Sequence, residues 1–169
     1  MPANAARRSL VTGLGALVVA ALAGGCGFRM RGPRPLAFKT LYVGLDANSE
    51  LGSALRRRVL TSGTTVVVDD PAAADARLEV LQNSRDREIL TLSSSGNVRE
   101  YLIILTIRFR LVGRSGDELL APVTLSVRRD YKFDDAEIIA KEREEALLFR
   151  DMENDLLQQV MDRLATVAP

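Results

Sequence analysis

The sequence predicts an α/β protein with an α+β two-layer fold, in which two helices pack on one face of a mixed sheet of four to five strands. Three observations carry this prediction: a strand-helix-strand pattern near residue 40, strictly alternating apolar residues near residue 105, and helical apolar spacing near the end. The expected order of elements is β-α-β-β-β-β-α.

The first elements form a βαβ unit. Residues 38–43 are a short apolar run typical of a strand, and Asn48 or Ser49 can cap a following helix that Gly63 ends. The β-branched run 64–68 predicts a second strand, buried on both faces and parallel to the first. The inner face of the helix consists of Leu51, Leu55 and Val59.

The middle of the chain predicts long antiparallel strands. Residues 76–82 alternate weakly and the strand can extend through Leu92, before a turn at 93–97. A turn at 113–117 leads to a partner strand that contains residues 123–127. Between the two turns the buried face of one long strand is expected to consist of Tyr101, Ile103, Leu105, Ile107, Phe109 and Leu111.

A long amphipathic helix is predicted after the strands and should lie on the sheet. Asp134 and Glu137 have the spacing of a capping box. The apolar residues that follow at helical spacing are Phe149, Met152, Leu156, Val160 and Leu164. We therefore expect one domain over residues 37–166.

The chain begins with the pattern of an export signal over residues 1–25. Arg7 and Arg8 make the start positive, and 10–23 is almost continuously apolar or small. This run of about 14 residues is shorter than the roughly 18–20 that a membrane-spanning helix needs. We interpret it as a signal peptide.

Cys26 follows small residues at the end of that signal, as in a bacterial lipobox. It is the only cysteine in the chain, and an unpaired thiol would be a liability in an oxidising compartment. The alternative is an ordinary secretory signal with a chance cysteine. We expect lipid attachment at Cys26 and a lipidated tether over 26–36. Gly27, rather than Asp, favours the outer membrane, on its periplasmic side.

Composition excludes several kinds of chemistry. The chain has no histidine, so a His-dependent triad, a Cys/His zinc site and haem ligation by His are ruled out. Without Arg7 and Arg8 it carries 21 basic and 22 acidic side chains, so no excess positive charge indicates nucleic acid. We expect no cofactor, no metal and no enzymatic activity.

Two groups of cations are candidates for binding an anion. The first is on the outward faces of the long strands, where we expect one neighbourhood beside the apolar Leu102 and Ile104. It consists of Arg108, Arg110, Arg128 and Lys132, with Arg99 at the edge. Guanidinium groups recognise phosphate bidentately, so this face suits a phosphorylated amphiphile. The alternative is a solvated face whose charges prevent aggregation.

The second candidate is Lys141, which lies among four glutamates. The alternative for Lys141 is a partner in ordinary surface pairs on a helix. Glu144 and Glu145 are not a catalytic pair, because adjacent helix positions diverge by about 100°.

Several motifs together resemble one family. They are Cys26 to Gly32 (CGFRMRG), Gly96 to Tyr101 (GNVREY), Arg128 to Tyr131 (RRDY), and the segment from Ala140 to Met152. In this order and spacing the chain resembles the LptE family of lipopolysaccharide-assembly lipoproteins.

The resemblance implies a non-enzymatic plug inside the outer-membrane β-barrel LptD, needed for assembly of the barrel and able to bind lipopolysaccharide. It also implies two helices on a four-stranded sheet. The family's ligand-binding lysine matches Lys141, whereas its basic residue before the long strand is replaced here by 93–95, three serines. Arg99 is a nearby substitute. With Arg128 and Lys132, these residues are the expected lipopolysaccharide site.

Two other classes stay open at this level. One is a periplasm-facing structural or scaffolding lipoprotein that binds a protein partner and no lipid ligand. The other, more remote, is a lipid-modifying enzyme, which the missing catalytic residues disfavour.

Overall fold

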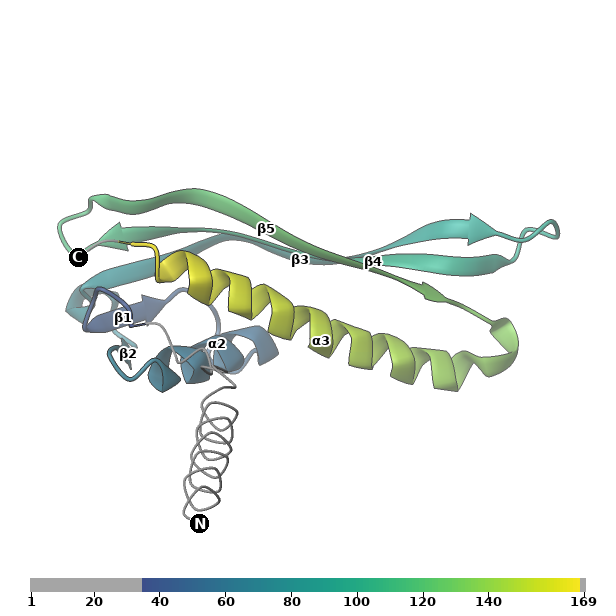
Figure 1. Cartoon of the computed structure of the whole chain (residues 1–169), viewed down its shortest axis with the longest axis horizontal. Coiled ribbons are helices and arrows are strands. Elements are labelled where there is room, and N and C mark those ends of the chain that lie inside the picture. Colours follow the sequence, from purple (N-terminus) through teal and green to yellow (C-terminus); the bar gives the residue numbers. More distant parts are fainter. Residues whose placement is uncertain (1–34, 168–169) are drawn as a thin grey trace, which may run out of the picture. The chain divides into compact units, whose positions relative to one another are not determined.

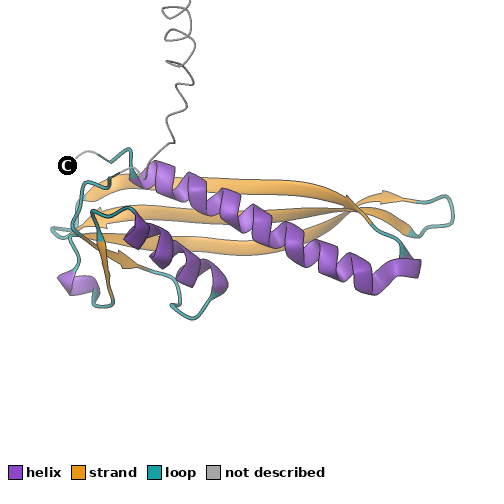
Figure 2. Cartoon of the chain, turned by 60° about the horizontal axis from the view of Figure 1, so that its bottom comes forward, coloured by secondary structure: helices purple, strands orange, loops and turns teal. Residues whose placement is uncertain are grey.

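The computed structural model describes residues 35–167, which form one mixed sheet with strand order β2-β1-β3-β4-β5. Both helices lie on the same face of this sheet (Figures 1 and 2). The elements are β1 (Thr40–Val43), α2 (Glu50–Thr61), β2 (Val66–Val68), β3 (Ala76–Leu92), β4 (Val98–Gly113), β5 (Glu118–Lys132) and α3 (Ile138–Leu164), with short 3-10 turns η1 (Pro71–Ala73) and η2 (Asp135–Glu137). The predicted order is confirmed. Cys26 and the predicted signal peptide lie outside the described residues.

The βαβ unit has the predicted caps and the predicted parallel strands. Ser49 Oγ accepts a hydrogen bond from the Gly52 backbone N–H at 3.0 Å, and Gly63 follows α2 with a φ of +75°. β1 pairs in parallel with both β2 and β3. The prediction that β2 is buried on both faces was wrong: β2 is an edge strand, so Val66 keeps 59% of its surface exposed.

β3, β4 and β5 form a long antiparallel meander that runs past α2 (Figure 1). The residues of β4 predicted to face the core do so, from Ile103 to Leu111, and Tyr101 is half-buried. A bulge in β3 between Val80 and Gln82 shifts its pairing with β4 by one residue. After it the odd-numbered residues of β3 face the helices as far as Ile89, where a second shift pairs Thr91 with Glu100.

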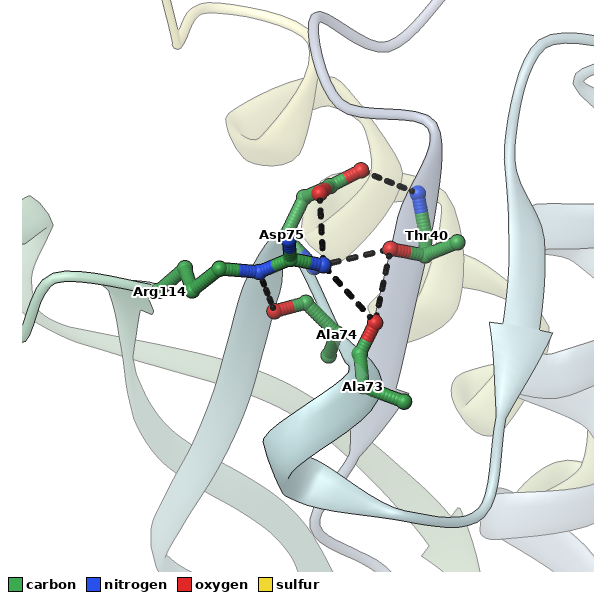
Figure 3. Close-up of polar contacts among 5 residues, drawn as sticks. All are labelled: Thr40, Ala73, Ala74, Asp75 and Arg114. Carbon is green, nitrogen blue, oxygen red and sulfur yellow. Dashed lines mark hydrogen bonds and ion pairs between the residues drawn. The ribbon is translucent and has the colours of Figure 1, made fainter.

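A polar network ties β1 to the turn between β4 and β5 (Figure 3). Asp75 accepts a hydrogen bond from the Thr40 backbone N–H at 3.0 Å and pairs with Arg114 at 3.1 Å. Arg114 also donates to the backbone oxygens of Ala73 and Ala74. The hydrogen bonds from Thr40 and the charge of Arg114 lower the pKa of Asp75 below its ordinary 3.8.

Packing divides the domain into two ends, which we define here. The proximal end is residues 35–80, 106–126 and 149–167, and it holds most of the apolar core, beginning at Leu36. The distal end is residues 81–105 and 127–148, in which only Ile103, Leu105 and Tyr131 are fully buried apolar residues. In α3 no residue before Phe149 is buried. Within residues 35–167, no helix is both long and apolar enough to cross a membrane.

Candidate functional site

A pocket of about 440 Å³ lies at the distal end. In Figure 1 the tip formed by β3 and β4 diverges there from the end of β5 and the start of α3. The lining residues come from all four elements and their connections: Thr91, Arg99, Glu100, Lys132, Phe133, Asp134, Glu137 and Lys141. Its size is within the range of about 300–1,000 Å³ that is usual for small-molecule sites.

Three of the four predicted lipopolysaccharide-binding residues meet in this pocket. Arg99 is at the start of β4, and its backbone oxygen accepts a hydrogen bond from the Phe133 N–H at 2.8 Å. Lys132 ends β5 opposite Glu100, and Lys141 is in the first turn of α3. The antiparallel pairing and the reversal of the chain into α3 therefore gather cations that are 42 residues apart in sequence.

The fourth residue, Arg128, does not line the pocket. It is exposed and paired with Ile104, four residues before Lys132 in β5. At about 3.3 Å per residue this is roughly 13 Å along the strand. Arg128 belongs to the sheet face away from the helices.

The prediction that the cations of that outward face form one neighbourhood was wrong. Arg110 is ten residues along β4 from Glu100, the partner of Lys132, which is about 33 Å in an extended strand. Arg110 instead pairs with Glu79 at 2.7 Å. In long antiparallel strands, residues share a face without sharing a neighbourhood, so this face carries a row of separated charges.

Lys141 is held as a cation. Its Nζ lies 2.8 Å from Glu144 Oε2, and its side chain is only 17% exposed. The hydrogen bond to Glu144, with the charges of Glu144, Glu137 and Asp134, raises the pKa of Lys141. The predicted surface pairing is thus present, although its spacing is i,i+3.

Charges in the pocket are balanced. Glu100, Asp134 and Glu137 line it together with the three cations. An anionic ligand must therefore compete with the protein's own carboxylates, and this competition makes binding sensitive to salt. Asp134 also caps η2, because its Oδ1 accepts a hydrogen bond from the Ala136 N–H at 3.0 Å. The predicted capping box does not start the long helix, since α3 begins at Ile138 and its N-cap residue, Glu137, makes no side-chain capping hydrogen bond.

An aromatic and ionic cluster beside the pocket fixes the start of α3 to the sheet. The Tyr101 ring packs against Tyr131 and Phe133, with centroid distances of 5.8 and 5.1 Å. Glu145 of α3 accepts a hydrogen bond from the Tyr131 hydroxyl and pairs with Arg87 at 3.1 Å. Burial and the hydrogen bond to Glu145 raise the pKa of Tyr131 to about 12, so the hydroxyl stays protonated and donates.

Sequence reasoning missed Arg85 and Arg87. Both side chains lie on the sheet face that α3 covers. Arg85 contacts Glu153 of α3, and its guanidinium carbon lies 4.4 Å from the centroid of the Phe149 ring. The guanidinium carbon of Arg87 lies 4.7 Å from the centroid of the Tyr101 ring in β4. Their spacing of two residues is a signal for one face of a strand. The sequence pattern predicts the wrong face for these two arginines. Alternation from Leu78 places the even-numbered residues of β3 toward the helices, and the bulge near Leu81 reverses this order.

The comparisons with known proteins agree with this architecture. The profile of the LptE family, described as lipopolysaccharide-assembly, matches residues 38–164. The LPS-assembly lipoprotein LptE of Pectobacterium atrosepticum is 27% identical over 162 residues, which cover 94% of this chain and 85% of that relative. The same protein of Yersinia enterocolitica is 28% identical, with 94% and 75% covered.

Solved structures show the same fold. An uncharacterized lipoprotein B from Nitrosomonas europaea has a TM-score of 0.68 and 31% identity, covering 83% of this chain and 91% of its own. The rare lipoprotein B from Shewanella oneidensis has a TM-score of 0.63 and 29% identity, with 76% and 95% covered. Because the family profile spans most of the described domain, this chain belongs to the LptE family of lipopolysaccharide-assembly lipoproteins.

Proposed function

We propose that this chain binds lipopolysaccharide at the distal pocket and partners an LptD-type β-barrel in the outer membrane. In this proposal a lipid on Cys26 anchors it on the periplasmic side, and it catalyses no reaction. The observation that carries the ligand site is the convergence of Arg99, Lys132 and Lys141 on one pocket. Phosphate groups are the anions that such cations bind well.

The outward face of the sheet supports the partnership with a barrel. Neither helix covers this face, because both lie on the other side of the sheet (Figure 1). It presents half-buried Leu102 and Ile104 beside the exposed Arg128. A mixture of apolar and cationic side chains is typical of protein interfaces, in which arginine is enriched. We therefore assign this face to the barrel and the pocket to the ligand.

The test compares Lys141→Asp and Lys141→Ala with the matched control Lys39→Asp. Lys39 is exposed at the proximal end, so its replacement makes the same change in net charge away from the pocket. Lipopolysaccharide binding is measured at two ionic strengths, and co-purifying barrel protein is probed in the same eluate. We expect Lys141→Asp to weaken binding more than Lys141→Ala, because it adds repulsion to a lost contact.

The expected loss for Lys141→Asp is about tenfold or more at low salt, and it should shrink at high salt because the exposed charges are screened. Lys39→Asp should bind as the wild type does. If Lys141→Asp and Lys141→Ala both bind lipopolysaccharide as tightly as the Lys39→Asp control does, the pocket is not the binding site. A barrel recovered without any lipopolysaccharide would favour a scaffolding lipoprotein instead.

A further inference from the structure

Exposed apolar side chains concentrate around the pocket. Ten large hydrophobic residues within the described part of the chain are exposed, and six of them lie in two segments, 89–92 and 138–147, each of which contains a residue that lines the pocket, Thr91 or Lys141. These six are Ile89, Leu90, Leu92, Ile138, Ile139 and Leu147. Single exposed apolar residues need no explanation, but a concentration of them marks an interaction site.

The two segments flank the pocket on opposite sides. On one side Leu90 and Leu92 are the neighbours of Thr91, which lines the pocket at the end of β3. On the other side Ile138 precedes Lys141 by three residues in α3, so both lie on the same helix face. Exposed apolar side chains therefore lie within three residues of the pocket lining on both sides.

We propose that these two margins bind the acyl chains of the amphiphile whose phosphates contact the pocket cations. This inference rests on the proposed function and adds a second, apolar half to the same site. The charges argue for an amphiphile over a protein partner, since lysine, glutamate and aspartate, which supply five of the six charges of the pocket lining, are depleted at protein interfaces. The only arginine in that lining is Arg99.

The chain offers a closely matched pair of variants. Leu92→Ser with Ile138→Ser removes one exposed apolar residue from a strand and one from a helix, with 55% and 48% exposure. Leu60→Ser with Val66→Ser does the same at the proximal end, with 54% and 59% exposure. All four positions are exposed, so we expect both double variants to fold.

Binding is measured with the full-length protein captured from solubilised membranes, at constant detergent concentration. The probes are purified lipopolysaccharide and the same material after alkaline removal of its acyl chains. The Leu92→Ser/Ile138→Ser variant should bind intact lipopolysaccharide about tenfold more weakly and the deacylated probe as the wild type does. The Leu60→Ser/Val66→Ser control should match the wild type with both probes.

Unchanged binding of intact lipopolysaccharide by the Leu92→Ser/Ile138→Ser variant would overturn the acyl site. Loss of the barrel protein with lipopolysaccharide binding intact would also overturn it, and would assign the margins to a protein partner. Failure of the proposed function looks different: Lys141→Asp would then bind the deacylated probe as the wild type does. If the wild type binds neither probe, both proposals fall.

Discussion

The two ends of this domain are built on different physical principles. At the proximal end, aliphatic side chains from α2, β1, β4 and the second half of α3 are fully buried, among them Leu41, Leu55, Leu111 and Val160. At the distal end, charged and aromatic side chains attach the first half of α3 to the sheet. Burial of apolar area dominates stability, so the proximal end should hold most of the free energy of folding.

The distal contacts are mostly accessible to solvent. The Arg87–Glu145 pair has side chains that are 50% and 20% exposed. The Arg129–Asp155 pair, which joins the distal part of β5 to the proximal part of α3, has side chains that are 53% and 52% exposed. Exposed ion pairs contribute about 0–1 kcal/mol each. The comparison teaches that the apolar core and the proposed binding pocket occupy different ends of one sheet.

The largest expected effect tests the proximal core. Leu55→Ala should lower the free energy of unfolding by about 2–5 kcal/mol, because it leaves a cavity where a fully buried side chain of α2 packs against the sheet. Leu147→Ala, at a distal position with 59% exposure, should change it by about 0.5 kcal/mol or less. Urea denaturation of both variants checks the difference. Equal losses would contradict the division into two ends.

A smaller, local effect is expected at the distal end. Tyr131→Phe removes the hydrogen bond to Glu145 and keeps the ring packed against Tyr101, so it should cost about 1 kcal/mol. Hydrogen exchange should quicken in residues 138–148 and stay unchanged near Leu156. Uniform acceleration along α3 would show instead that the helix opens as one unit.

The smallest effect concerns pH and the network at the proximal tip. The folded pKa of Asp75 is lowered, so its stabilisation is present above pH 3.8 and is lost as pH falls through the folded value. Asp75→Asn should therefore be less stable than the wild type at pH 7, and the difference should narrow in strong acid. Thermal unfolding at pH 7 and pH 3 measures this. If the difference in stability between Asp75→Asn and the wild type is the same at pH 7 and pH 3, Asp75 does not contribute to the pH dependence of stability.

Local patterns in the sequence were sufficient for most of the elements. Strict alternation from Tyr101 to Leu111 predicted β4 and its buried face, because a strand with one buried face needs a period of two. Ser49 and Gly63 marked the ends of α2, because caps are satisfied by residues within one turn. The apolar spacing after Phe149 predicted the buried part of α3. The lysine at 141 was singled out by resemblance.

Tertiary structure alone decided which residues meet. The bulge near Leu81 reversed the faces of the second half of β3, and no local preference marks that position. Strand pairing then separated Arg128 from the pocket and joined Arg99 to Lys132. Each of these outcomes depends on register between segments that are distant in the chain. A sequence specifies the period of each strand locally, whereas register is fixed by the packing of the whole sheet.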